Sequence, residues 1–304
     1  MKADWSVVVA SRSENSDLFK AASGGYGLFG AITEAEIELT ENATYRKTAQ
    51  VMPIDDYPSY FQSQILNKNE IGLHFARLNL SSNSFMHEVI AVSYVEDARA
   101  QCDTTLEPEA DIYKNKAQLF LLRHFDFIKT VRWPLEVRLE TQEQIVTRNQ
   151  AMRPPVKCLS YKSKTHTDIL QEYFIPVREF SNFAEGLRGI AQENGINLLN
   201  VTIRYVPKDK TSALPYAKED SFAFVLYVTQ GLSEKEYEKA EAWTRALIDA
   251  ALDCKGTYYL PYQLYASKEQ INQAYPEMKD WLDMKKIHDP KEVFSNTFYE
   301  TYRF

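Results

Sequence analysis

The chain has 304 residues, enough for one large domain or two ordinary ones with a sizeable core. Apolar residues make up 44% and charged residues 25%, as in soluble globular proteins. The net charge of −7 argues against nucleic acid or an anionic membrane as the main partner, because both require a basic surface. We expect no membrane span and a cytoplasmic location, because apolar runs are short and the three cysteines are widely separated.

The N-terminal region predicts two strands that flank a glycine-rich loop. Residues 5–10 are rich in β-branched side chains, and residues 33–39 alternate apolar side chains with glutamates. That period of two predicts a half-buried strand with one acidic, solvated face. Between these segments, four of the ten glycines of the chain fall within residues 24–30.

The glycine loop spells a familiar motif in an unfamiliar context. Residues 25–30 read Gly-Tyr-Gly-Leu-Phe-Gly and match G-x-G-x-x-G. A dinucleotide site requires a helix directly after this motif, but a predicted strand follows here. A protein-kinase loop is excluded because no H-R-D or D-F-G element lies downstream. Two interpretations stay open: a backbone that a flat ligand approaches closely, or a tight turn that needs positive φ.

The middle of the chain predicts helices and strands without a sequence repeat or a low-complexity segment. The predicted elements are a helix over 57–66, strands over 71–80 and 89–95, a helix over 114–128 with a Trp133-Pro134 interruption after it, and a connector over 149–155.

Residues 169–260 predict a β-α-β-β-α-β order. The strands are 169–176, 197–206, 221–229 and 256–260, with helices over 180–190 and from Ser233 onward. Gly195 fits the residue that ends the first helix, and Ser233 with Glu236 fits a capping box that opens the second. The order is the split βαβ arrangement, so we expect an α+β fold with a ferredoxin-like antiparallel sheet backed by helices.

Both ends of the chain carry longer motifs. Residues 16–19 read Ser-Asp-Leu-Phe, and residues 24–33 read Gly-Gly-Tyr-Gly-Leu-Phe-Gly-Ala-Ile-Thr. Near the C-terminus, residues 258–262 read Tyr-Tyr-Leu-Pro-Tyr, residues 286–290 read Lys-Ile-His-Asp-Pro, and residues 294–296 read Phe-Ser-Asn. Together these motifs resemble the FAD-linked oxidases of the vanillyl-alcohol oxidase superfamily, in particular sugar-lactone and alditol oxidases and decaprenylphosphoryl-ribose oxidase.

The resemblance implies a division of the chain and a chemistry. Residues 1–45 would be the last piece of an FAD-binding domain of the PCMH type, and residues 46–255 a substrate (cap) domain. Residues 256–304 would return to complete the flavin site. The implied cofactor is FAD, and the implied reaction is hydride transfer from a sugar-like CH–OH donor, such as a lactone or polyol, to the flavin.

The resemblance also implies site residues. The backbone that would line FAD comprises Gly24, Gly25, Gly27, Gly30, Ala31 and Ile32. Tyr259 would approach the flavin ring, while Glu172, Arg204 and Tyr262 would carry catalysis. The active-site histidine of alditol oxidases falls on Val225 and the lysine of decaprenylphosphoryl-ribose oxidases on Tyr262, so neither substrate is carried over.

The same residues also fit ordinary structural roles. Glu172 fits the solvated face of a strand, Arg204 fits a surface ion pair, and Tyr262 fits core packing. The alternative function is therefore a non-catalytic α+β module that binds a partner or ligand. The five histidines lack the spacing of a metal site, and we expect no metal.

The resemblance leaves the first part of the flavin domain without a counterpart in this chain. Three explanations stay open: a fragment, a split gene with a separately encoded N-terminal half, or a decayed oxidase. We expect the chain alone to bind FAD weakly or not at all. We also expect self-association through the exposed remnant of the flavin domain.

Overall fold

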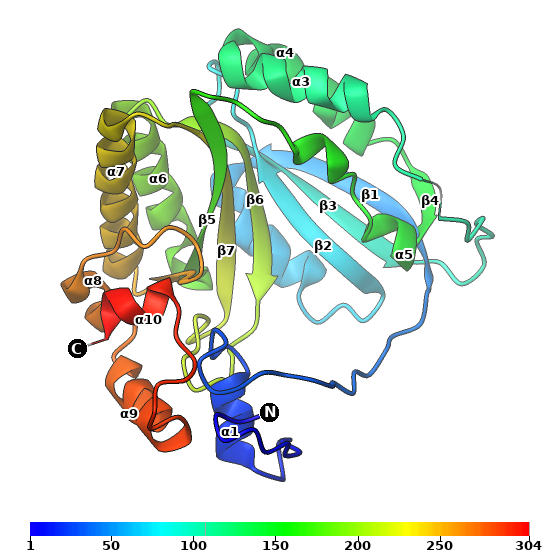
Figure 1. Ribbon diagram of the computed structural model, residues 1–304. Coiled ribbons are helices and arrows are strands. Elements are labelled where there is room, and N and C mark those ends of the chain that lie inside the picture. Colours follow the sequence, from blue (N-terminus) through cyan, green and yellow to red (C-terminus); the bar gives the residue numbers. More distant parts are fainter. Residues whose placement is uncertain (107, 304) are drawn as a thin grey trace.

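Eight strands form one antiparallel sheet in this computed structural model, which describes residues 1–106 and 108–303 (Figure 1). Their order across the sheet is β4-β1-β3-β2-β6-β7-β5-β8. The strands are β1 (Thr44–Pro53), β2 (Ile71–Leu78), β3 (Glu88–Glu96), β4 (Gln144–Thr147), β5 (His166–Pro176), β6 (Asn197–Val206), β7 (Ser221–Gly231) and β8 (Thr257–Tyr258). The expected α+β fold with an antiparallel sheet is confirmed.

Helices cover both faces of the sheet and gather at its lower end. They are α1 (Ser16–Ala22), α2 (Tyr57–Tyr60), α3 (Ile112–His124), α4 (Phe127–Glu140), α5 (Arg148–Ala151), α6 (Phe180–Glu193), α7 (Glu234–Asp253), α8 (Lys268–Ala274), α9 (Met278–His288) and α10 (Thr297–Tyr302). None of the helices in the described part of the chain combines the length and apolar character needed to cross a bilayer.

The sheet consists of two halves with the same topology. In the second half, β5-α6-β6-β7-α7-β8 forms the expected split βαβ unit, with spatial order β8-β5-β7-β6. The first half repeats that order as β4-β1-β3-β2, and the halves join through a short antiparallel β2–β6 pairing. Each half therefore has one edge strand paired with the other half, β2 in the first and β6 in the second.

Alternation along β5 shows which helices lie on which face. Asp168 contacts Arg123 of α3, whereas Gln171 contacts Thr244 of α7. Residues three apart on a strand point to opposite faces, so α3 and α7 cover opposite sides of the sheet. The α7 side also carries α6 and α2, whose Phe180 and Tyr57 rings pack on β7.

Of the local signals of the second half, the glycine that ends α6 is confirmed, while the expected capping box of α7 forms only its Ser233 half among the described residues. Gly195 follows the last residues of α6 with φ of 57°, the left-handed conformation that favours glycine. At the start of α7, Ser233 Oγ accepts a hydrogen bond from the Glu236 backbone N–H at 3.3 Å. The predicted strand over 256–260 shortens to the two residues of β8.

The two strands expected near the N-terminus do not form. Residues 5–10 and 33–39 have no secondary structure and pair with no strand among the described residues. Val7 is 71% exposed and Leu39 is 87% exposed. An alternation of apolar and polar side chains is typical of a strand, but a strand forms only where a neighbouring strand completes its backbone hydrogen bonds.

Two further expectations in the middle of the chain are wrong. Pro134 lies inside α4 and does not interrupt the helix, and the expected helix over 114–128 ends at His124. The Glu136 and Glu140 carboxylates of α4 pair with Arg77 on the sheet, which anchors the helix despite its missing N–H. The expected connector over 149–155 begins with the short helix α5.

Candidate functional site

The glycine loop is an open turn at the lower end of the sheet. Gly24 and Gly27 have φ of 83° and 76°, which favours glycine, and both are exposed. A Cβ at Gly27 would have no heavy atom within 4 Å. The main chain at Gly24 and Gly27 is therefore accessible to a flat ligand. The positive φ angles also agree with the alternative interpretation, a tight turn that needs glycine.

The remaining residues of the loop anchor it to the protein. Leu28 and Phe29 are buried, and the Phe29 ring lies 5.3 Å from that of Trp281. A Cβ at Gly25 would overlap the Ala21 carbonyl oxygen, so this position has no room for a side chain. Gly25 is thus needed for packing.

The C-terminal motif fixes the glycine loop in place. Asn296 Nδ2 donates a hydrogen bond to the Tyr26 carbonyl at 2.8 Å, while Asn296 Oδ1 accepts from the Tyr299 backbone N–H and caps α10. Upstream, the fully buried Asp289 carboxylate pairs with Lys285 and accepts the Phe294 backbone N–H. The two ends of the chain, which carry the longest motifs, therefore form one unit.

Four tyrosines meet beside this loop. The ring of Tyr259 lies 5.1 Å from that of Tyr262 and 5.5 Å from that of Tyr216. Burial, together with the neighbouring Tyr259 and Tyr216 side chains, raises the pKa of Tyr26. We call Tyr26, Tyr216, Tyr259 and Tyr262 the tyrosine cluster.

Glu172 and Arg204 project from the sheet toward the tyrosine cluster. Glu172 on β5 and Thr202 on β6 both lie opposite Val225 of β7, and Arg204 follows two residues along β6 on the same face. Burial raises the pKa of the Glu172 carboxyl, although Arg204 partly opposes the shift. Burial and the charge of Glu172 raise the pKa of Tyr262 above its ordinary value of 10.0, at which the phenol is already protonated at neutral pH.

Two buried polar atoms beside the cluster have no hydrogen-bond partner among residues 1–106 and 108–303. They are the Tyr258 hydroxyl and Gln263 Oε1, and both residues line a cavity of about 10 Å³ together with Glu172, Tyr259 and Tyr262. That volume is about the size of one water and is far too small for a flavin ring. A flavin ring would therefore have to lie on the exposed side of the cluster, where the described residues fit one wall of a flavin site.

The predicted site residues fall into two groups. The structure brings Glu172, Arg204, Tyr259 and Tyr262 together, and Tyr259 lies beside Tyr26 of the glycine loop. Two others lie apart from the exposed glycines: Ala31 exchanges backbone hydrogen bonds with Met1, and Ile32 is 72% exposed. A Cβ at Gly30 would meet the Met1 carbonyl, so Met1 covers that part of the loop.

Sequence reasoning missed Tyr26, Tyr216 and Asn296 as members of the site. Tyr26 was visible as the residue between two loop glycines, and Asn296 as the last residue of the Phe-Ser-Asn motif. Tyr216 lies in the connection between β6 and β7, where no periodic pattern predicts its position. The ring of Tyr216 stacks on Phe174 at 4.4 Å, which fixes its place.

Comparison with known proteins gives one short similarity. The chain is 36% identical over 62 residues to an FAD-dependent monooxygenase of the fungus Arthrobotrys oligospora. The matched stretch is 20% of this chain and only 12% of the monooxygenase. No protein-family model matches the chain.

Proposed function

We propose that the chain is part of an FAD-dependent oxidoreductase whose substrate is a sugar-like molecule oxidised at a CH–OH carbon. The single observation that carries the proposal is the meeting of the exposed Gly27 turn, the tyrosine cluster and Glu172 at one end of the sheet. The similarity to an FAD-dependent monooxygenase supports the flavin. The resemblance to sugar-lactone and alditol oxidases supports the donor class.

The chemistry divides between the cofactor and the side chains. Bound FAD would supply the two-electron acceptor for hydride leaving the substrate carbon. Glu172 would take the hydroxyl proton, because its raised pKa brings the carboxylate closer to the strength of a base that works near neutral pH. Tyr262, whose phenol is protonated at neutral pH, would donate a hydrogen bond to the substrate.

Arg204 would position the substrate. Its side chain is exposed on the same sheet face as Glu172, and no ion pair within 4.0 Å involves Arg204 among the described residues. A guanidinium in this position can orient substrate oxygens by paired hydrogen bonds. The Glu172 and Arg204 side chains would then contact the same substrate from neighbouring strands.

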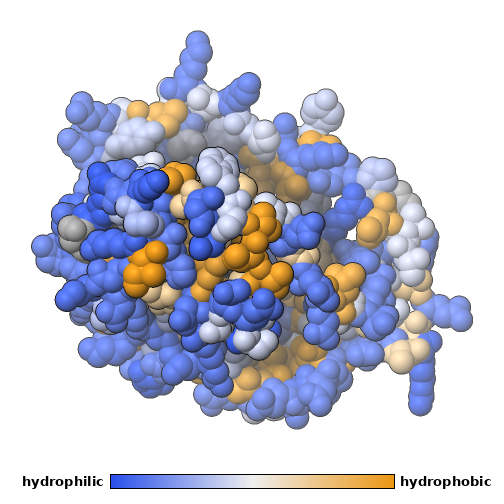
Figure 2. All heavy atoms as spheres, turned by 60° about the horizontal axis from the view of Figure 1, so that its bottom comes forward, coloured by the Kyte–Doolittle hydropathy of each residue, from blue (hydrophilic) through white to orange (hydrophobic). Residues whose placement is uncertain are grey.

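We also propose that a partner chain completes the flavin site. Residues 33–39 carry glutamates on one side and exposed apolar side chains on the other, including Ile37 at 73%. Figure 2 shows apolar side chains scattered among polar ones at the end of the molecule that carries the termini. If this segment paired antiparallel with a second copy, one register would place glutamates directly opposite glutamates. The register shifted by one residue would place glutamates opposite apolar side chains, so that neither face of the pair would be wholly apolar. A strand with basic alternate residues, such as a separately encoded N-terminal half could supply, fits better.

A second candidate is a non-catalytic module that binds a partner or a ligand. The observation that favours it is size: the cavity beside Glu172 holds about 10 Å³, whereas a cavity at the opposite end of the sheet has about 330 Å³. Flavin binding at the tyrosine cluster separates the two candidates.

The test is a titration of FAD with the full chain while flavin fluorescence is followed. We expect weak quenching, with a dissociation constant in the millimolar range, because the described residues supply only one wall of the site and an isoalloxazine that stacks on Tyr259 loses emission. Tyr259→Ala should weaken binding at least fivefold, consistent with a loss of about 1 kcal/mol of aromatic contact. Tyr113→Ala is the control, because Tyr113 is 89% exposed on α3. Equal quenching by the two variants would contradict the proposal.

A further inference from the structure

A second and larger cavity lies away from the tyrosine cluster. It has a volume of about 330 Å³, within the range of small-molecule sites, and it is lined by the start of β5, the end of β7 and the first turns of α7. His166, at the start of β5, lines this cavity, whereas Glu172 lies six residues further along the strand. At about 3.3 Å per residue, the two places are about 20 Å apart.

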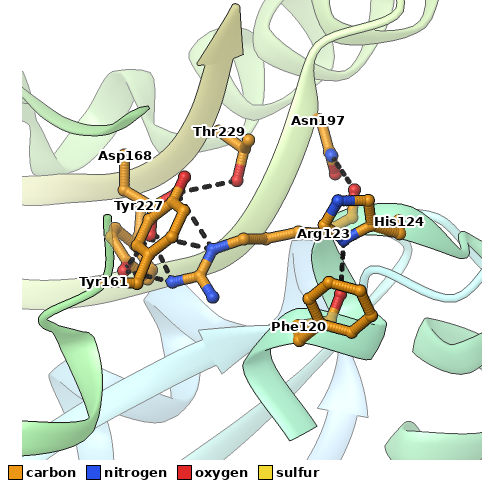
Figure 3. A network of polar contacts seen from close by, with 8 residues as sticks. All are labelled: Phe120, Arg123, His124, Tyr161, Asp168, Asn197, Tyr227 and Thr229. Carbon is orange, nitrogen blue, oxygen red and sulfur yellow. Dashed lines mark hydrogen bonds and ion pairs between the residues drawn. The ribbon is translucent and has the colours of Figure 1, made fainter. Parts of the chain in front are cut away.

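A buried ion pair holds one wall of this cavity. Arg123, which lines the cavity, binds the Asp168 carboxylate with Nη2 at 2.6 Å, and the two side chains are only 4% and 8% exposed (Figure 3). Asp168 also accepts hydrogen bonds from Tyr161 at 3.1 Å and from Thr229 at 2.9 Å, and a further one from Tyr227. The charge of Arg123 is thus already neutralised, and the wall is rigid.

One lining residue holds a buried acceptor without a donor. Gln230 is 5% exposed, and its Oε1 has no hydrogen-bond partner in the described structure. This acceptor is closed off from the cavity in this structure, because the atom is buried and the Gln230 side chain interacts with Tyr265. A ligand O–H or N–H would therefore reach it only after the Gln230 amide turns toward the cavity, and would then remove the cost of the unpaired carbonyl. The side chains of Val228, Ala240 and Trp243 line the same cavity and give it an apolar part.

The mouth of the cavity is basic. The exposed Lys162 and Lys239 line it, and neither forms an ion pair among the described residues. The exposed ring of His124 also lines it, and its Nδ1 donates a hydrogen bond to the Phe120 carbonyl at 2.8 Å. Glu236 is the one carboxylate that lines the cavity beside these cations, so an anionic ligand gains net attraction.

We infer that this cavity binds a small organic anion with a flat apolar body. The body would lie along Trp243 and Val228, and the anionic group would lie beside Lys162 and Lys239. The Gln230 amide would turn so that its Oε1 accepts a hydroxyl or N–H at the other end of the ligand. The site uses none of the residues assigned to the flavin wall. It therefore does not depend on the proposed oxidoreductase function.

Three related compounds test the inference by calorimetric titration of the full chain. The probe 4-hydroxybenzoate carries both polar ends, benzoate lacks the hydroxyl, and 4-hydroxybenzyl alcohol lacks the charge. We expect 4-hydroxybenzoate to bind about fivefold to tenfold more tightly than either relative, the size of one buried hydrogen bond or one paired charge. Its binding should also change the fluorescence of Trp243, and that signal should disappear in Trp243→Phe while the heat remains.

Substitutions of the exposed lysines at the mouth test the charge contribution without changing the hydrophobic core. Lys162→Gln with Lys239→Gln should weaken 4-hydroxybenzoate at least threefold, and added salt should remove the difference. Lys164→Gln with Lys235→Gln is the control, because these exposed lysines do not line the cavity. Gln230→Leu should abolish the preference for 4-hydroxybenzoate over benzoate, and the comparison in the unmodified chain stands if this variant does not fold. Equal affinity for the three compounds, or no saturable binding below millimolar concentrations, would overturn the inference.

Discussion

Asp289 shows how much one side chain can organise. Its carboxylate pairs with Lys285 at a place where both side chains are 0% exposed, and it accepts the backbone N–H groups of Val293 and Phe294. Burial alone would raise the pKa of Asp289, but Lys285 and these hydrogen bonds hold it below its ordinary value. The Lys-x-x-Asp-Pro motif contains only the acid; the buried lysine lies one residue before it.

Replacing Asp289 should therefore be strongly destabilising. We expect Asp289→Asn to lower the free energy of unfolding by about 3 kcal/mol, because it leaves the Lys285 ammonium buried without a counter-charge. Asp283→Asn is the matched control, since its ion pair with Lys286 is exposed and contributes less than about 1 kcal/mol. Urea unfolding curves measure both. Similar losses in the two variants would show that the burial of the Lys285 pair has no energetic consequence.

The raised pKa of Glu172 predicts a pH dependence with a definite sign. The folded chain binds the Glu172 proton more tightly than the unfolded chain, so the stability contributed by this group falls as pH rises above its ordinary value of 4.5. The loss ends at the higher pKa of the folded state. Glu172→Gln keeps the shape and removes the titration, so the wild type should lose stability relative to the variant across that interval. If the difference in unfolding free energy between the wild type and Glu172→Gln does not change with pH, the burial of Glu172 is contradicted.

At the scale of elements, the glycine loop depends on different glycines for different reasons. Gly25→Ala would place a methyl group against the Ala21 carbonyl and the Phe29 ring, whereas Gly189 in α6 has open space around it. We expect Gly25→Ala to cost about 2 kcal/mol through overpacking and Gly189→Ala to gain about 0.5 kcal/mol through helix propensity. Thermal unfolding measures whether each substitution lowers or raises the stability. Stabilisation by both substitutions would mean that the loop is not packed as described.

Elements that find their partners within this chain were predictable from periodicity. The strands β5, β6 and β7 and the helices α6 and α7 follow their hydrophobic patterns closely. Residues 5–10 carry a strand signal of similar strength but stay unpaired. No local pattern reports whether a neighbour exists. For the same reason Pro134 was misjudged: its helix is held by ion pairs to Arg77, which is distant in sequence.

At the scale of the whole molecule, the repeated topology of the sheet left no trace in the sequence. The two halves share a strand order, but they differ in which face their second connecting helix covers, because α4 and α7 lie on opposite sides. Because the corresponding helices pack on opposite faces, the two halves bury different residues along their strands. The shared strand order is therefore not accompanied by a repeat in the sequence. The tyrosine cluster was foreseen only in part, since Tyr216 joins it through tertiary packing alone.

The exposed segment over 33–39 predicts self-association that increases with salt. Its apolar side chains favour contact with a second copy, while its glutamates oppose that contact. Raising the ionic strength from about 0.01 M to about 1 M shortens the Debye length from about 30 Å to about 3 Å and removes the repulsion. Sedimentation velocity should therefore show a larger mean mass at high salt, and Leu39→Glu should prevent the increase. A clean monomer at both ionic strengths would exclude this surface as a self-contact.

The most direct measurement is the mapping of a bare flavin ring onto the folded chain. Lumiflavin, which lacks the nucleotide part of FAD, is titrated into isotope-labelled protein while backbone amide resonances are followed. The exposed turn predicts shifts at Gly24, Gly27 and Tyr259, with the residues around Gln230 and His166 unchanged. Shifts confined to the distant cavity, or none at saturating lumiflavin, would show that the glycine loop and the tyrosines do not form a wall for flavin.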